Sequence, residues 1–485
     1  MDRLPAAAQW LDRLTFALLV VVAVAIGLTP KALALAIPVV VVWIAKLAAG
    51  GGPPARSALV APMLALLIAA ACASYFAYDP VASWARARTF AALLLAMIVG
   101  NTATSYARIR TVACAVLASA IVAAGCAAWQ RAFGIGLSFS EPPAWMAQAG
   151  LSSADILTRV DTKRVHTPPQ WVNAVASLDQ RAKVRLDFLR QPDDHPITVT
   201  VSAGQMVAAG LNRLDAVKTA HPARAIGFYN HYLPFSYLLT MVALLAWGMA
   251  LRSTRNDRWL FLGVFGVLSA CLAVTVTRSA MAFLIFAALV VVWRVAGWKL
   301  RAATVAFATL VLLLGSLWLR HERGVGWISI ADAGTQYRLA IWRDGLHLVR
   351  QHPIVGVGFD NVFRHPEHWS IDAFRRFPLV AHFHSNVVEY AVDGGLLTLA
   401  AWLWLLVAYG FMLVRTVRGA EHDPPLHGIS LGIFGGFVAF LGISLVQYIG
   451  ADPAIMTLFW LLMGLAIAID QLGRNRGAQP PADFA

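Results

Sequence analysis

The chain has 485 residues, of which 59% are hydrophobic and only 13% are charged, and its mean hydropathy is +0.66. A soluble protein cannot bury so large an apolar fraction, so the composition excludes a soluble globular protein and indicates a polytopic membrane protein. The formal net charge of +14 does not indicate nucleic-acid binding, because the basic residues are spread over many loops and are not gathered in one domain.

Apolar segments of membrane-spanning length recur along the chain. The hydrocarbon core of a bilayer is about 30 Å thick, so a helix that crosses it needs roughly 20 apolar residues. This measure predicts an all-α polytopic membrane protein with about twelve transmembrane helices. They are expected near residues 15–28, 33–49, 58–77, 84–100, 110–129, 229–251, 258–277, 279–297, 302–319, 390–414, 428–447 and 452–470.

The lysines and arginines of the short loops predict the orientation of the chain, because these residues are enriched on the cytoplasmic side of a membrane. Sixteen of them lie at one set of helix ends and four at the opposite ends. We therefore predict that both termini are cytoplasmic, which agrees with an even number of spans. The larger set is Arg3, Arg13, Lys46, Arg56, Arg108, Arg110, Arg252, Arg255, Arg258, Arg294, Lys299, Arg301, Arg415, Arg418, Arg474 and Arg476; the smaller set is Lys31, Arg86, Arg88 and Arg278.

Two long segments do not read as membrane spans, and on this topology both face outward. They divide the chain into five parts. These are residues 1–129 with the first five helices, 130–228 as an external insert, 229–319 with helices six to nine, 320–389 as an external loop, and 390–485 with the last three helices and a cytoplasmic tail.

The external insert is predicted to be a small α+β domain. The segments "VRLDFL" and "ITVTVS" alternate in polarity and flank the turn-rich "QPDDHP", which predicts a β-hairpin. The following "AGQMVAAGLNRLDAVKTA" predicts a short helix. The three histidines of the external insert, His166, His195 and His221, lack the close spacing of a zinc site. The insert could recognise substrate, dock a partner or have no role in the activity.

The external loop begins with a predicted amphipathic helix in "QYRLAIWRDGLHLVRQHPIVGVGFDNVF". Pro353 is expected to end this helix, and Gly356 and Gly358 then allow a tight turn. A helix of this kind is expected on the membrane surface or over the end of the helix bundle. Its apolar residues recur at helical spacing as one predicted stripe: Leu339, Trp342, Leu346 and Val349.

Three arginines break the topology rule. Arg86 and Arg88 begin the fourth predicted span, and Arg278 lies in a short corner between two spans, all at the predicted outer face. Arginine at a membrane boundary is costly to desolvate unless it is paired, and acidic residues are scarce in the neighbouring short loops. An anionic ligand is one partner that suits guanidinium groups, and lipid phosphates are the alternative.

Few ionisable residues lie at the middle of the predicted spans, where coupled transporters place them. The polar groups gather instead at the outer ends, which favours chemistry at the outer surface. The segment "HFHSNVVEYAVDGG", residues 382–395, places His382, His384 and Ser385 before a long apolar run. An imidazole has a pKa suited to moving a proton. The residue pattern alone does not choose between the two histidines.

These segments together resemble the bacterial O-antigen ligase and O-antigen polymerase superfamily. The resemblance rests on "AIWRDGLHLVRQHPIVGVGFDNVF" followed by "HFHSNVVEYAVDGGLLTLAAWLWLL", on "TVTRSAMAFLIF", which is similar to the family's T-x-S-R corner with Arg and Ser exchanged, and on "RAIGFYNHYLPFSYLL". It covers roughly residues 224–415. The chain departs from the family pattern at Ser385, where Asn is frequent, and at Thr398, where Gly is frequent.

The resemblance implies an inverting glycosyltransferase of GT-C-type architecture that needs no metal and no other cofactor. Its implied donor is a glycan on undecaprenyl diphosphate, and its implied acceptor is lipid A–core oligosaccharide, in the bacterial inner membrane with the active site at the periplasmic face. His384 is the position that matches the family's histidine, which implies a catalytic role, and His382 receives none. The guanidinium groups suited to the diphosphate are Arg278 and Arg338, then Arg224, with Arg86 and Arg88 as an outer ring.

Other readings remain open at this point. A polymerase would transfer the glycan to another lipid-linked repeat unit, and a related branch of the superfamily uses protein hydroxyls as acceptors. A transporter of an anionic lipid-linked substrate would also use external arginines, but it would favour ionisable residues at mid-span. A membrane scaffold would leave the histidine cluster and Arg278 unexplained.

Overall fold

The structure, a computed structural model, describes residues 5–51, 57–179, 182–190, 195–209, 211, 213–229, 231–323, 327, 333–369, 371, 373 and 382–477. Arg3 and Arg56 of the topology count and the predicted turn at residues 191–194 lie outside the described residues. The chain divides into two compact units. The first consists of Met1–Ser119, Thr240–Gly266 and Arg278–Ala485, and the second of Ala120–Leu239 and Val267–Thr277.

The predicted membrane class is confirmed by the helices. Among the described residues, ten helical segments are long and apolar enough to cross a membrane, and two shorter apolar helices, Ala32–Ala48 and Val60–Tyr75, account for the other two predicted spans. The ten are Ala6–Leu28, Pro80–Thr102, Tyr106–Phe133, Tyr232–Arg252, Asn256–Val274, Arg278–Val295, Trp298–Trp318, Gly395–Gly419, Pro424–Val446 and Pro453–Arg474.

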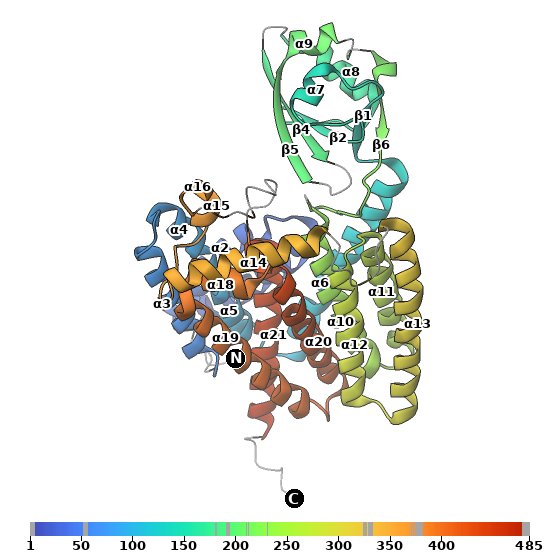
Figure 1. Cartoon of the computed structure of the whole chain (residues 1–485). Coiled ribbons are helices and arrows are strands. Elements are labelled where there is room, and N and C mark those ends of the chain that lie inside the picture. Colours follow the sequence, from blue (N-terminus) through green and yellow to red (C-terminus); the bar gives the residue numbers. More distant parts are fainter. Residues whose placement is uncertain are drawn as a thin grey trace, which may run out of the picture. The chain divides into compact units, whose positions relative to one another are not determined.

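The helices follow one another in a simple order (Figure 1). They are α1 (Ala6–Leu28), α2 (Ala36–Ala48), α3 (Val60–Tyr75), α4 (Pro80–Ala87), α5 (Leu94–Thr102), α6 (Tyr106–Phe133), α10 (Tyr232–Arg252), α11 (Arg255–Val274), α12 (Arg278–Val295), α13 (Trp298–Arg323), α14 (Ala333–Gln351), α15 (Asn361–Arg364), α16 (Pro366–Trp369), α18 (Asn386–Asp393), α19 (Gly395–Gly419), α20 (Pro424–Val446) and α21 (Pro453–Gly477), with short 3-10 turns η1 (Ala32–Leu35), η2 (Arg88–Leu93) and η4 (Ile449–Ala451).

The core of the first unit is built around α20 and α21, whose apolar windows are 72% and 83% buried. α21 packs against α5, α19 and α20, and α20 packs against α12. Small residues allow the close approach, because a Cβ on Gly464 of α21 would meet the side chain of Val99 on α5 at 2.5 Å. In contrast, α13 has only 6% of its apolar window buried, as expected for a helix that faces lipid.

A buried ionic cluster joins three helices of the first unit. Asp12 on α1 accepts from Lys46 on α2 at 2.6 Å and from Arg108 on α6 at 2.7 Å. The three side chains are 4%, 6% and 17% exposed, respectively. The carboxylate therefore compensates two cations that would be costly to bury alone.

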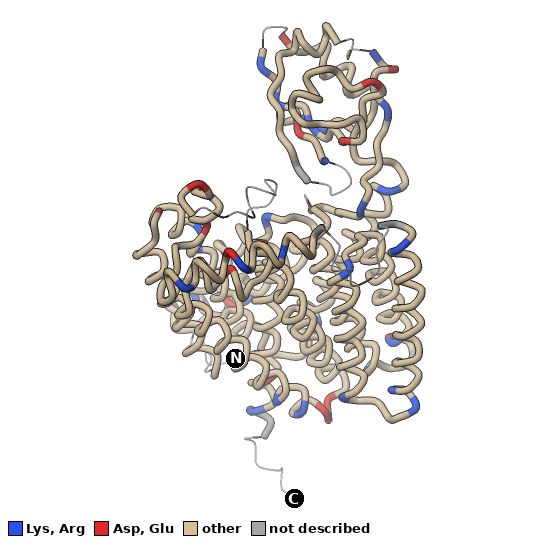
Figure 2. Tube along the Cα trace, in the orientation of Figure 1, with Lys and Arg blue, Asp and Glu red and all other residues tan. Residues whose placement is uncertain are grey.

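The basic turns of the first unit lie at one end of the bundle. Figure 2 shows lysines and arginines gathered where α10 meets α11, where α12 meets α13, and near the C-terminal end of α21. The α20–α21 connection, α14 and α18 lie at the opposite end (Figure 1). The arrangement fits the charge asymmetry from which the orientation was predicted; the orientation itself stays a prediction.

The second unit contains an antiparallel sheet in the order β5-β4-β2-β1-β6, with β3 paired to β2. The hairpin prediction is confirmed, because β4 and β5 pair from Lys183↔Ser202 to Arg190↔His195. The strands are β1 (Gly136–Phe139), β2 (Ile156–Val160), β3 (Lys163–Arg164), β4 (Lys183–Arg190), β5 (His195–Ser202) and β6 (Val217–Ala220), and the helices of this domain are α7 (Ala144–Gln148), α8 (Pro168–Ala176) and α9 (Ala203–Ala208).

The helix predicted after the hairpin is correct only for α9. Ser202 caps α9 in a capping box with Gln205, but the chain then forms a 3-10 turn (Leu214–Ala216) and β6. The reason is tertiary: β6 pairs with β1, with Phe139 opposite Val217, and Val217 belongs to the buried core of the insert.

Candidate functional site

The histidine loop is not the direct start of a membrane span. Ser385 caps α18 by accepting from the N–H of Val388, and α18 ends at Asp393 before α19 begins at Gly395. The single span predicted over 390–414 is therefore two helices with a break at the paired glycines. His384 precedes the short helix α18 and is only half-buried.

His384 has an unusual backbone conformation. Its φ is +48°, in the left-handed region that costs a non-glycine residue roughly 1–2 kcal/mol. The loop is held on both sides of this position, because the N–H of Phe383 donates to Glu389 Oε2 at 2.6 Å and the carbonyl of Phe383 accepts from Trp342 Nε1 at 2.8 Å. Such strain persists where the surroundings determine the conformation, and it is frequent at functional sites.

The described neighbours of the His384 ring come from three places in the chain. Its Nδ1 lies 3.1 Å from Oε1 of Gln447, which follows α20. The ring of Tyr337 on α14 packs edge-on at 5.7 Å between centroids, and that of His382 lies 4.3 Å away. His382 in turn lies 5.8 Å from the ring of Tyr448. These contacts hold the imidazole between α14 and the α20–α21 connection.

The amphipathic helix is confirmed as α14, which ends before Pro353, but its predicted apolar stripe is correct only for Trp342 and Val349, which pack against the buried cluster. Leu339 and Leu346 are 54% and 55% exposed. The buried face of α14 is rotated about the helix axis relative to the predicted stripe, because it packs on the histidine loop and on α18. Its residues are Tyr337, Ile341 and Leu348, which cluster with Phe383 and Val392.

The predicted glycine turn meets the glycines that separate α18 from α19. Gly356 and Gly358 have φ of +70° and +99°, and the N–H of Gly358 donates to the carbonyl of Asp393 at 2.8 Å. Gly395 has a φ of +67°, and a Cβ on it would overlap the carbonyl of Ile354. The glycine turn after α14 and the glycines between α18 and α19 therefore contact each other closely. These contacts fix the end of α18 against the loop after α14.

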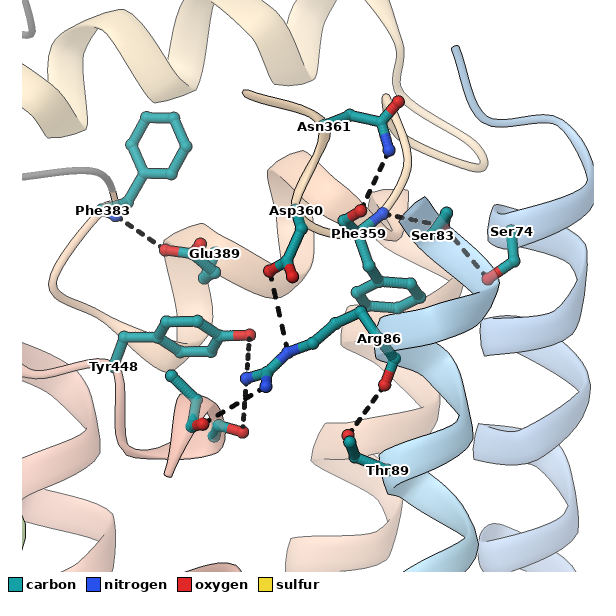
Figure 3. A network of polar contacts seen from close by, with 12 residues as sticks. Ser74, Ser83, Arg86, Thr89, Phe359, Asp360, Asn361, Phe383, Glu389 and Tyr448 are labelled. Carbon is teal, nitrogen blue, oxygen red and sulfur yellow. Dashed lines mark hydrogen bonds and ion pairs between the residues drawn. The ribbon is translucent and has the colours of Figure 1, made fainter. Parts of the chain in front are cut away.

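Arg86 joins the site from α4, as Figure 3 shows. Its Nη2 donates to the carbonyl of Gly450 at 3.0 Å and to Tyr448 Oη at 3.5 Å, its Nη1 donates to Ala451 O at 3.2 Å, and its Nε lies 3.8 Å from Asp360 Oδ1. The side chain is 15% exposed. The guanidinium therefore holds the α20–α21 connection, which carries Gln447.

Asn386 holds the same connection from α18. Its Oδ1 accepts from the N–H of Ile449 at 2.8 Å and from that of Gly450 at 3.2 Å. Since Arg86 binds the carbonyls and Asn386 the amides, both polar sides of this short segment are satisfied in the buried interior. The segment is thus tied to the helix that follows the histidine loop.

Two buried carboxyl groups lie one helical turn apart on α18. Glu389 is 6% exposed and Asp393 is 2% exposed. Burial raises the pKa of Glu389 well above its usual value, the nearby charge of Asp393 raises it further, and the Phe383 N–H and the Arg86 guanidinium oppose the shift. Burial also raises the pKa of Asp393, with a further contribution from Asp360. The pair is therefore suited to holding a proton above the usual range of carboxyl groups.

The predicted arginines lie at different places. Arg88 is exposed at the start of η2, and Arg278 is half-buried as the first residue of α12. Arg338 is half-buried on α14, next to the Tyr337 that contacts His384, and its Nη1 donates to Gly334 O at 3.4 Å. Arg224 belongs to the second unit, where it is 7% exposed with its guanidinium 4.1 Å from the ring centre of Tyr232.

The sequence reading missed Gln447, Asn386 and Asp360. One signal was present: Gln447 ends a predicted span at the predicted outer face, as a polar residue after an apolar run. Within the described part of the chain, no group of three or more His, Cys, Asp or Glu side chains is placed to hold a metal ion.

Comparison with known proteins supports the resemblance. No curated protein matches the chain. A family model described as O-antigen ligase matches residues 263–403, a range that includes Arg278, α14, the glycine turn and the His384 loop. This match supports membership of the chain in the O-antigen ligase and polymerase superfamily.

Proposed function

We propose that the chain is an inverting, metal-independent glycosyltransferase that moves a glycan from undecaprenyl diphosphate to an acceptor hydroxyl, with lipid A–core oligosaccharide as the favoured acceptor. The observation that carries this proposal is His384. It lies in a strained, doubly anchored loop at one end of a helix bundle, with its ring fixed by a hydrogen bond.

The proposed reaction needs one base and one site for negative charge. His384 takes the proton of the acceptor hydroxyl while the acceptor oxygen forms a bond to the anomeric carbon. The bond from that carbon to the donor's phosphate oxygen breaks on the opposite face, which inverts the anomeric centre. The undecaprenyl diphosphate leaves with the electron pair, and the proton on His384 returns to solvent.

Arginines are proposed to stabilise the diphosphate. Guanidinium groups bind phosphate oxygens bidentately, and their effect is greatest where charge develops as the leaving group departs. Arg278 and Arg338 are the principal candidates, and Arg224 and Arg88 are further ones. Arg86 remains a candidate of the outer ring, although its contacts with Gly450 and Ala451 already give it a role within the protein.

The proposed location is the bacterial inner membrane, with cytoplasmic termini and the site at the periplasmic face. The basic turns at one end of the first unit and the His384 loop at the other support this orientation, because basic loops favour the cytoplasmic side. The bilayer and a lipid-linked glycan are then the natural surroundings of the site.

The first test is substitution of His384 in the full-length protein in lipid nanodiscs. Transfer is followed on a gel with an undecaprenyl-diphosphate-linked glycan and lipid A–core. We expect His384→Ala to lower kcat by about 10²- to 10⁴-fold with an unchanged melting temperature. His347→Ala, which removes an exposed histidine of α14, is the matched control. Full transfer by a well-folded His384→Ala variant would refute the assignment.

The second test concerns the arginines. Arg278→Ala and Arg338→Ala are expected to raise the KM for the donor and to lower kcat, because diphosphate contacts act on both binding and departure. A wild-type KM and kcat in both variants would contradict the diphosphate role.

The acceptor is tested in a deletion strain of the source organism. Loss of capped lipid A–core with accumulation of lipid-linked polymer supports a ligase. Loss of chain lengthening with transfer of single repeats would indicate a polymerase, and loss of glycan from periplasmic proteins with unchanged lipopolysaccharide would indicate a protein acceptor.

A further inference from the structure

Gln447 is a buried polar residue at the site that the sequence reading did not identify. It follows the last residue of α20, is 5% exposed, and lies 63 residues from His384 in the chain. Its Oε1 lies 3.1 Å from His384 Nδ1, a normal hydrogen-bond distance.

The hydrogen-bonding chemistry of Gln447 and His384 decides which ring nitrogen of His384 carries the proton. A glutamine Oε1 only accepts hydrogen bonds, so His384 Nδ1 must be the donor in this contact. A neutral imidazole carries one N–H, and when Nδ1 carries it the lone pair is on Nε2. The hydrogen bond thus selects the tautomer in which Nε2 can accept a proton.

Gln447 is itself held in place. Its backbone is extended, with φ of −146° and ψ of 145°. The segment that follows is fixed by Asn386, which accepts from two of its amides, and by Arg86, which donates to two of its carbonyls. The side chain therefore approaches His384 from a connection with little freedom to move.

The absence of charge on Gln447 has a consequence of its own. A carboxylate at this position would stabilise the imidazolium and raise the pKa of the histidine. An amide oxygen orients the ring with a much smaller effect on its charge, which suits a base that must be neutral before it acts. Titratable groups that pack against the ring include Tyr337 from α14 and His382 from the same loop.

We propose that Gln447 is a positioning residue that holds His384 as its Nδ1–H tautomer, so that Nε2 is the proton-accepting atom in glycan transfer. The inference deepens the proposed function and rests on it for the role of His384 as a base. The tautomer itself is a property of the protein that can be measured without any substrate.

The test combines a spectroscopic and a kinetic measurement on the full-length protein in nanodiscs. In ¹⁵N-histidine-labelled protein, the His384 signals are identified by their loss in His384→Ala. We expect the wild-type signals of a protonated Nδ1 and an unprotonated Nε2. In Gln447→Leu this preference should be lost, while in Gln447→Glu it should remain and the ring should titrate about 1 pH unit higher.

The kinetic measurement separates positioning from folding. Gln447→Leu is expected to lower kcat by about 10- to 100-fold with an unchanged donor KM. Gln447→Glu should move the acidic limb of the pH–rate profile upward by the same shift as its titration, because the base must lose its proton before it acts. The matched control is Gln471→Leu, which lies near the C-terminal end of α21, whereas Gln447 precedes its N-terminal end. This variant should change neither the His384 signals nor the kinetics.

Two results would overturn the inference: a wild-type His384 protonated on Nε2, or a Gln447→Glu variant whose His384 titrates as in the wild type. A folded His384→Ala variant that transfers glycan would instead refute the proposed function. In that case the spectra still decide whether Gln447 sets the tautomer.

Discussion

Glu389 offers a sharp test of how the His384 loop is held. Its Oε2 accepts the N–H of Phe383 at 2.6 Å, and both residues are buried, at 6% and 1% exposure. The bond anchors the residue next to the strained His384. Glu389→Ala removes the acceptor and leaves a buried N–H without this partner.

The size of the expected effect follows from the buried Phe383 N–H, which loses its acceptor in this variant. Leaving a buried donor unsatisfied costs about 1–3 kcal/mol, comparable to the strain of roughly 1–2 kcal/mol at His384. The loop can then relax toward unstrained conformations, and each 1.36 kcal/mol changes a population by about tenfold. We therefore expect Glu389→Ala to lower kcat by about 10- to 100-fold.

Glu389→Gln is the informative partner variant. Burial raises the pKa of Glu389, so the neutral glutamine resembles the protonated carboxyl and keeps an oxygen for the Phe383 N–H. We expect a change in kcat of less than about threefold, well below the 1.36 kcal/mol of a tenfold change. Glu367→Ala, at a glutamate whose side chain is 75% exposed, is the control.

The assay is glycan transfer by the purified variants, with the melting temperature measured in parallel. Wild-type kcat in Glu389→Ala would refute the anchoring role. An equal loss in Glu389→Gln and Glu389→Ala would show that the carboxyl acts through its proton and not through the loop.

Two further predictions concern stability. Asp12→Ala is expected to lower the melting temperature more than Asp470→Ala: each carboxylate pairs with two cations, but those of Asp12 are 6% and 17% exposed and those of Asp470 are 53% and 51% exposed. Losing a buried partner costs about 3–5 kcal/mol, and equal losses would contradict this reasoning. Burial raises the pKa of Asp452 to about 6, against the hydrogen bonds from Ile455 and Ala454, so its stabilising contribution is present at low pH and is lost as the pH rises through about 6. Asp452→Asn should therefore show a smaller fall in melting temperature between about pH 5 and about pH 7 than the wild type, and an identical fall would count against it.

Local patterns predicted much of the fold. Apolar run length predicted the helical membrane class, because a helix satisfies its own backbone in lipid. Alternation predicted the β4–β5 hairpin. Pro353 correctly marked the end of α14, and Gly356 and Gly358 adopt the positive φ that a tight turn requires. Each of these features depends on neighbouring residues in the chain.

The errors have one physical cause in common. The apolar stripe of α14 was placed through Leu339 and Leu346, yet the buried face is set by Phe383 and Val392, which lie far away in the sequence. The C-terminal part of the helix predicted after the hairpin is instead β6, because β1 offers an edge to pair with. In both cases a distant partner outweighed the local pattern.

The amino-acid sequence by itself determined that the chain is a helical membrane protein, and it predicted a histidine motif and three arginines at the outer ends of helices, since run length, spacing and charge are local properties. Only the tertiary structure decided that Gln447, from a connection 63 residues away, orients His384, and that Arg86 and Asn386 hold that connection. These are single hydrogen bonds between distant segments. No periodicity in the sequence records them, because they arise only when packing of α18, α20 and α21 brings the three segments together.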